Sequence, residues 1–424
     1  MKINTVAQMC LKKSLSRDYI GIAKASLYSG LGFSQKTIKC RTMSNQSPVR
    51  ENILLGMGNP LLDMTVLKGG ADLLAKYGLE ANNAVLASPQ QLSIFKEIVE
   101  KYTPTYIAGG ATQNSIRVAQ WLLQTHWATT FLGSVGDDMF KHILEDAANG
   151  VGVNVHYQVY SGDHTGVCAA IITGEDRSLI TELGAASKFC ATFLHQPEVW
   201  KLVEEAEFYY VGGFLLTVSP DAVLEVAKHS SEHNKVCSSN LHAPFLCKLF
   251  ADPNLGLMQY VDLLFGNGDE AREFAKEAGL ANQGETMPNV KEIALRVASL
   301  PKANQSRPRV VVFTQGGKEP IVVATQGEVW EMPVVPLKPE DIKDTNGCGD
   351  AFVGGFLSQL VQAVAAAVVV AAVAAVAVAV VVVAAAATVV AAVAVVVVAA
   401  AAAAAVVVVE EEEEEEEEER DKED

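Results

Sequence analysis

The hydrophobic pattern between about residues 51 and 362 is that of strands alternating with helices. Short apolar runs at residues 53–57, 208–211, 261–265 and 310–314 predict buried strands. Longer segments with apolar residues at helical spacing lie between them, at 113–124, 139–148, 221–233, 270–278 and 290–299. Because strands that alternate with helices usually form parallel sheets covered on both faces, we expect an α/β fold with a mostly parallel sheet.

A different pattern occupies the region between residues 156 and 181. The segments 156–160, 166–173 and 178–181 alternate between apolar and polar residues with a period of two. This period is typical of antiparallel strands with one exposed face. We therefore expect a smaller sheet, appended to the main one and built from these three strands.

The pattern ends at Gln362. Residues 363–409 contain only Ala and Val apart from Thr388, and residues 410–424 are an acidic tail with 13 acids and two bases. The Ala/Val tract exceeds the length needed to span a bilayer, but it lacks Leu, Phe and interfacial aromatic residues. It also has the composition of an aggregation-prone segment. A third interpretation is a nucleotide-repeat expansion or artefact, because codons for Ala, Val, Glu and Asp all begin with G.

Residues 1–50 form a basic leader, whose excess of positive charge lies in its first 42 residues. Residues 1–42 carry eight Lys and Arg against one Asp, with no long apolar core. This composition resembles a mitochondrial transit segment. The alternative is a disordered leader upstream of a start at Met43.

Charge and cysteine content narrow the class of protein. The whole chain has a net charge of −17, and the body remains acidic without its two termini, which argues against binding to a nucleic-acid backbone. Seven cysteines include no C-x-x-C pair, as suits a reducing compartment. We expect a cytoplasmic or nuclear protein, or a mitochondrial one if the leader is a transit segment.

The strongest chemical motif is DTNGCGDAF at residues 344–352, followed by a segment of helical spacing. Gly347 and Gly349 allow a sharp turn whose backbone N–H groups point into one concavity at a helix N-terminus, where anions bind. Asp350, just inside the helix, could take a proton from a hydroxyl while those amides stabilise a transferring phosphoryl group. The alternative is that Asp350 is only a helix-start acid favoured by the dipole.

Two other segments offer polar groups for a ligand. Gly109 and Gly110 are expected at a strand end just before a helix, where paired glycines permit close approach of a ligand, and Asn114 offers both a donor and an acceptor. Asn59 and Asp63 follow the first strand in GMGNPLLD and could bind a vicinal diol, because a carboxylate accepts two hydroxyl protons. Each feature alone is common in loops.

Together these segments resemble the ribokinase-like (PfkB) carbohydrate kinase family over about residues 51–362. DTNGCGDAF marks the family, and GMGNPLLD with AGGATQNSIRVAQW (108–121) points to its adenosine branch rather than to ribose or fructose phosphate kinases. The resemblance implies a three-layer α/β sandwich with a small β lid. It also implies transfer of phosphate from ATP to the 5′-hydroxyl of adenosine, giving AMP and ADP, with Mg²⁺ as cofactor.

The resemblance assigns a role to each matching position. Asp350 matches the catalytic base, and Gly347, Cys348 and Gly349 match the anion hole, with Cys348 where the family usually has Ala. The ribose-binding set is matched by Asn59, Asp63, Gly109, Gly110 and Asn114. Asn267 and Glu270 match an Asn-x-x-Glu motif that serves Mg²⁺ through bound water, Thr314 and Gly316 match the ATP site, and Arg177 matches a lid arginine near the phosphates.

The C-terminal tract is the main departure from the family. Family members continue with helices that pack on the sheet and close part of the ATP site, and the Ala/Val tract supplies none of their side chains. We therefore expect a kinase domain at 51–362 that is incomplete at its C-terminus, and a chain that is insoluble or weakly active as written. The alternatives are a family kinase for another nucleoside or sugar, and an inactive remnant. We expect a monomer that binds adenosine and ATP, without nucleic acid or membrane.

Overall fold

The computed structural model describes residues 49–66, 70–80, 84–173, 176–281, 287–317, 319–334, 337, 345 and 347–362. The basic start, the Ala/Val tract and the acidic tail therefore lie outside the described residues, as do Asp344 and Asn346 of the DTNGCGDAF motif. No helix within the described ranges is long and apolar enough to cross a membrane.

The main sheet has nine strands in the order β14-β13-β12-β11-β10-β9-β1-β5-β6. Every neighbouring pair from β12 to β6 is parallel, and the last two pairs, β12 with β13 and β13 with β14, are antiparallel. The strands are β1 (Leu54–Met57), β5 (Thr129–Gly136), β6 (Asn154–Tyr160), β9 (Phe208–Gly212), β10 (Val236–Asn240), β11 (Leu263–Asn267), β12 (Val310–Thr314), β13 (Ile321–Thr325) and β14 (Glu328–Met332). The predicted mostly parallel sheet is confirmed.

Helices cover both faces of this sheet and make the three layers. The described helices are α3 (Gly70–Tyr77), α4 (Ser93–Lys101), α5 (Ala111–Leu123), α6 (Met139–Asn149), α7 (Ala191–Leu194), α8 (Pro197–Glu205), α9 (Pro220–Glu232), α10 (Cys247–Ala251), α11 (Gly268–Glu277), α12 (Val290–Ala298) and α13 (Cys348–Gln362). Successive strand residues alternate between two cores: Leu55 and Tyr209 pack with α8, α9, α11 and α12, whereas Leu54 and Tyr210 pack with α5 and α13. All five predicted helical segments are found.

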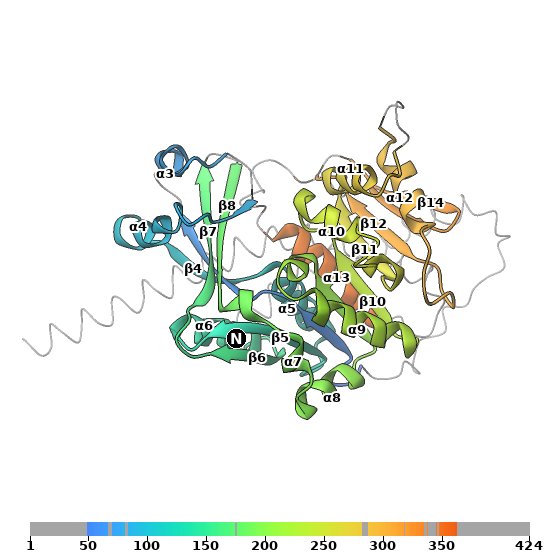
Figure 1. The fold of residues 1–424 in the computed structure, drawn as a ribbon, viewed down its shortest axis with the longest axis horizontal. Coiled ribbons are helices and arrows are strands. Elements are labelled where there is room, and N and C mark those ends of the chain that lie inside the picture. The colour runs from blue at the N-terminus through green and yellow to red at the C-terminus, as the bar shows by residue number, and fades with distance from the viewer. Residues whose placement is uncertain are drawn as a thin grey trace, which may run out of the picture.

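A second sheet of five strands forms the lid, in the order β3-β8-β7-β2-β4. Its strands are β2 (Leu61–Val66), β3 (Ala84–Leu86), β4 (Thr105–Gly109), β7 (Thr165–Thr173) and β8 (Asp176–Gly184). A core of its own joins it to α3, α4 and α6. Figure 1 shows this lid, with α3 and α4, standing to one side of the body that carries α9 to α12.

One predicted lid strand belongs elsewhere. Residues 156–160 lie in β6, which pairs in parallel with β5 at the edge of the main sheet. An edge strand with a partly exposed face shows the same alternation as an antiparallel strand, so periodicity alone could not separate the two. The other two predictions, 166–173 and 178–181, are confirmed as the antiparallel pair β7 and β8.

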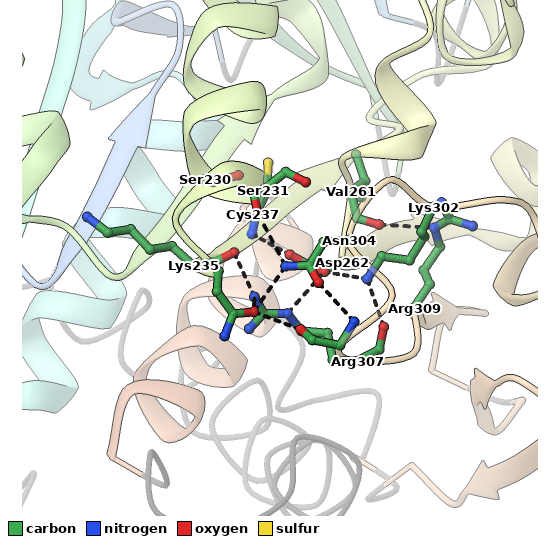
Figure 2. A network of polar contacts seen from close by, with 12 residues as sticks. Ser230, Ser231, Lys235, Cys237, Val261, Asp262, Lys302, Asn304, Arg307 and Arg309 are labelled. Carbon is green, nitrogen blue, oxygen red and sulfur yellow. Dashed lines mark hydrogen bonds and ion pairs between the residues drawn. The ribbon is translucent and has the colours of Figure 1, made fainter.

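A buried polar network links the amino ends of the three strands β10, β11 and β12 (Figure 2). The functional groups described below lie at the opposite, carboxyl ends of these strands. Asp262, just before β11, accepts a hydrogen bond from the Cys237 backbone N–H at 3.0 Å and forms ion pairs with Lys302 and Arg307. Arg309, just before β12 and 1% exposed, donates to five backbone carbonyls: those of Met258, Val261, Val297, Leu300 and Pro301. Because these buried charges are paired or hydrogen-bonded, they hold the amino ends of these strands together.

Candidate active site

A cavity of about 390 Å³ lies between the lid and the carboxyl ends of the central strands. Its lid side is formed by Leu61, Asp63, Val85, Leu86, Cys168, Leu179, Thr181 and Leu183. Its body side includes Asn240, Gly266, Asn267 and Thr314, at or next to the ends of β10, β11 and β12. A crevice beyond the carboxyl ends of parallel strands is the usual place for a ligand in open α/β sheets.

The N-termini of α5 and α13 meet at this cavity. Gly110 precedes α5 with φ of 88°, and a Cβ there would lie 2.5 Å from the Asn59 carbonyl oxygen, so only glycine fits. Farther along, Gly354 of α13 packs so close to α5 that a Cβ would lie 2.4 Å from the Ser115 carbonyl oxygen. The close packing of the two helices directs both N-termini at the cavity, where their dipoles favour a negative charge.

A hydrogen bond joins the two predicted motifs inside the cavity. The Asn114 amide Nδ2 of α5 donates to the Asp350 carboxylate Oδ2 of α13 at 3.0 Å, across 236 positions of sequence. Gly347, with φ of 69°, makes the turn into α13, and both Gly347 and Gly349 line the cavity. Cys348 is not among the described residues that line it. The sequence therefore predicted the position of Asp350 just inside the helix correctly.

Asn59 and Asp63 approach the cavity from the body and from the lid. Asn59 is 7% exposed, and neither polar atom of its side chain is hydrogen-bonded to a residue that the structure describes. Such a buried amide is costly without a partner, which marks it as a group that a ligand would satisfy.

The sequence suggested that Asp63 lies in a loop after the first strand. In the structure it lies instead within the strand β2. The even-numbered residues Leu62 and Met64 are buried in the lid core, so Asp63 faces the other way, into the cavity. Gly109 does not line the cavity, but a Cβ there would lie 2.3 Å from the Asp63 carboxylate. Gly109 is therefore needed to make room for that carboxylate.

Asn267 and Glu270 form a capping box at the start of α11. The Asn267 backbone N–H and side-chain amide donate to the two Glu270 carboxylate oxygens at 2.9 and 2.7 Å. Burial raises the pKa of Glu270 to about 7, and the hydrogen bond from Asn267 opposes that rise. Both residues line the cavity, as does Thr314, whereas Gly316 is not among the described lining residues.

These residues fit a hydrated Mg²⁺ ion bound through few protein groups. Among the described residues no ion pair joins Glu270 to a basic side chain, so its buried carboxylate fits a cation. The same part of the chain holds no group of three or more His, Cys, Asp or Glu that could bind a metal alone. Mg²⁺ commonly keeps several waters and takes other ligands from substrate phosphates.

Arg177 cannot be placed beside these groups. Its backbone pairs with Ile172 in the β7 and β8 hairpin of the lid, and its side chain lies outside what the structure describes. Its assignment near the phosphates remains a prediction.

An aromatic cluster in the lining of the cavity was not assigned from the sequence. Phe214, His242 and Phe245 line the cavity there, and the Phe214 and His242 rings stack with centroids 5.2 Å apart and planes 19° apart. Phe214 and Phe245 lie 6.1 Å apart between ring centroids. The available signal was that FLLTVSP (214–220) and NLHAPF (240–245) lie at the carboxyl ends of β9 and β10, but aromatic residues there do not by themselves specify a ligand.

Comparisons with known proteins agree with this geometry. Residues 71–394 match the family model described as pfkB family carbohydrate kinase. The chain is 46% identical over 312 residues to adenosine kinase 2 of Arabidopsis thaliana, covering 74% of this chain and 88% of that protein. It is 43% identical over 312 residues to adenosine kinase of Schizosaccharomyces pombe, covering 73% and 88%. Among solved structures, Anopheles gambiae adenosine kinase in complex with P1,P4-di(adenosine-5) tetraphosphate matches with a TM-score of 0.72 and 42% identity, covering 78% of this chain and 95% of that one.

Proposed function

This chain belongs to the pfkB family of carbohydrate kinases, and we propose that it transfers the γ-phosphoryl group of ATP to the 5′-hydroxyl of adenosine. The observation that carries the proposal is the 3.0 Å hydrogen bond from Asn114 to Asp350, which joins a ribose-binding segment to the expected base. The relatives named adenosine kinase support adenosine as the acceptor and ATP as the donor. The products are AMP and ADP.

Asp350 acts as the general base in this proposal. Asn114 orients its carboxylate, and the first turn of α13 follows directly from Gly347. As the 5′-oxygen attacks, Asp350 accepts its proton, while the N–H groups of residues 347–349 stabilise the negative charge on the transferring group. Catalysis of this kind depends on positioning and charge stabilisation more than on covalent chemistry by the protein.

The polar and the aromatic residues that line the cavity suit the two parts of a nucleoside. Asp63 accepts hydrogen bonds from the 2′- and 3′-hydroxyls, and Asn59 satisfies its buried amide on the sugar. Phe214 and Phe245 offer aromatic faces to the base. A free sugar would leave these aromatic faces without a contact.

The remaining residues serve the phosphates. Mg²⁺, when bound, supplies positive charge that offsets the charge of the ATP phosphates, and Glu270 with Asn267 would hold it through water. Thr314 and Gly316 line the ATP site in this proposal, and Arg177, in β8 of the lid, is assigned to the phosphates on the family resemblance alone.

We also propose a kinase domain at 51–362, a monomeric state and a reducing compartment, either cytoplasm or nucleus, or mitochondria if residues 1–50 are a transit segment. Three of the described cysteines, Cys190, Cys237 and Cys247, are free thiols, which supports a reducing compartment.

The proposed function is tested by supplying ATP, with and without Mg²⁺, and a panel of acceptors: adenosine, inosine, ribose and fructose 6-phosphate. We expect AMP from adenosine, dependent on Mg²⁺, and much slower reaction with the others. A preference for a sugar would instead identify another kinase of the same family. Binding of adenosine with no product from any acceptor would identify an inactive remnant.

A further inference from the structure

We propose that His242 is a positioning residue that fixes the ring of Phe214 for contact with the nucleoside base. The inference rests on the proposed function, because it concerns how the same cavity recognises adenosine. It follows from the backbone of His242, from the contacts of its two ring nitrogens and from its stacking on Phe214.

The backbone of His242 adopts a conformation that few side chains accept. Its φ is 62°, in the left-handed region, and His242 lies in the segment that follows β10. Its backbone N–H donates to the Asn240 side-chain Oδ1 at 3.2 Å, which helps to hold this turn. A non-glycine residue kept in this region beside a cavity costs free energy, which points to a use for its side chain.

The two ring nitrogens of His242 have different partners. Nδ1 accepts a hydrogen bond from the Gly213 backbone N–H at 3.1 Å. A neutral imidazole that accepts through Nδ1 carries its proton on Nε2, so Nε2–H donates to the Tyr210 hydroxyl oxygen 3.3 Å away. Burial lowers the pKa of His242 to about 4, so the ring is neutral at physiological pH and keeps both contacts.

These contacts act on Phe214 in two ways. Gly213 is the first residue of the short helix η2 (Gly213–Thr217), so the bond to Nδ1 fixes the backbone that carries Phe214. The His242 ring also stacks on the Phe214 ring, 5.2 Å between centroids. A Cβ at Gly213 would lie 2.4 Å from the Asn240 carbonyl oxygen, which shows how closely the two segments approach.

An aromatic wall binds a planar base best when its ring is already in place. Stacking depends on ring orientation, and a ring that must be ordered on binding weakens affinity. His242 supplies that order before the nucleoside arrives. Loss of its ring should therefore weaken adenosine binding and leave ATP binding and the chemical step largely intact.

The test is a double-mutant cycle of His242→Asn and Phe214→Ala, with KM for adenosine, KM for ATP and kcat measured for each variant. Asn tolerates the left-handed backbone but lacks the ring. We expect His242→Asn to raise KM for adenosine about five- to tenfold, the scale of an aromatic stacking contact, with KM for ATP within about twofold. In the Phe214→Ala background, the same substitution should add almost nothing to KM.

Two controls keep the test decisive. Tyr210→Phe removes only the hydroxyl that accepts from Nε2 and should change KM for adenosine less than His242→Asn does. His242→Gly relieves the backbone and should reproduce the KM change if the Asn variant folds poorly. Independent, additive effects, or equal rises in KM for adenosine and ATP, would overturn the inference alone. A wild-type chain that neither binds nor phosphorylates adenosine would overturn the proposed function, and the inference with it.

Discussion

Asp63 shows how a single residue reaches the cavity through the strand that carries it. β2 alternates buried and partly exposed positions, so the face opposite the lid core is turned to the cavity. A Cβ at Gly109, on the neighbouring strand β4, would lie 2.3 Å from the carboxylate and would displace it from this position. The sequence indicated that Asp63 could bind a ligand, but it did not indicate that Asp63 belongs to a strand. Pro60 directly precedes β2, and a proline there favours a turn or loop in a prediction from sequence.

The Asp63 assignment predicts discrimination against 2′-deoxyadenosine. Loss of one hydroxyl leaves a carboxylate contact unpaired, so kcat/KM should fall by about tenfold or more relative to adenosine. Asp63→Asn provides the matched control, since it should lower efficiency with adenosine and narrow the difference between the two nucleosides. Equal efficiencies in the wild type would remove Asp63 from the ribose site.

Motif residues were easier to predict than the aromatic ones. Asp350, Gly347 and Gly349 stand in a pattern whose spacing has a chemical reason, and the structure places them at a helix start beside the cavity. Phe214 and His242 belong to no motif whose spacing indicates a chemical role. Their roles depend on a stacked contact between two segments that follow different strands, which only the fold brings together.

At the scale of elements, the packing of α5 against α13 sets the geometry of the site. The bond from Asn114 to Asp350 spans these helices, and Gly354 permits their close contact. Both helices could be predicted from their apolar spacing. Their contact could not, because Asn114 and Asp350 lie 236 positions apart and the sequence gives no local signal of which helices become neighbours.

Gly354→Ala should destabilise the protein although alanine favours helices. The intrinsic gain from removing a helical glycine is about 0.5–1 kcal/mol. The new Cβ would lie 2.4 Å from the Ser115 carbonyl oxygen and 2.7 Å from the Val118 Cβ, and such overpacking typically costs about 1–3 kcal/mol. We expect a lower denaturation midpoint in urea.

The control for that experiment is Gly317→Ala, where, apart from its two chain neighbours, no atom that the structure describes lies within 4 Å of the added Cβ. It should change the free energy of unfolding by no more than about 0.5 kcal/mol. A Gly354→Ala protein as stable as this control would mean that the two helices separate without cost, and that their packing does not hold Asp350 in place.

At the scale of the whole molecule, the three-layer fold and the lid were predictable because long periodic segments dominate the chain. The prediction that residues 156–160 belong to the lid was wrong. They form β6, an edge strand of the main sheet, and its partly exposed face gives the alternating pattern that is typical of antiparallel strands. The Ala/Val tract is a different case: the family model matches as far as residue 394, which is past the end of α13 at Gln362. Its composition supplies no polar face and no specific side chains for a nucleotide site.

We expect residues 363–424 to limit solubility and activity. Replacing them with the C-terminal segment of Arabidopsis thaliana adenosine kinase 2 should increase both the yield of soluble protein and the rate of ATP-dependent AMP formation. Size-exclusion chromatography and initial rates on both proteins provide the comparison. An unmodified chain that purifies as a soluble monomer, with the activity of the chimera, would show that the tract is tolerated.

The most direct test of the account is AMP formation by Asp350→Asn, compared with the wild-type chain and repeated in the chimera. The substitution keeps the size of the side chain and removes the proton acceptor. We predict that kcat falls by about 10²-fold or more while the dissociation constant for adenosine changes little. Turnover near the wild-type rate would contradict the assignment of Asp350 as the base, and with it the proposed mechanism.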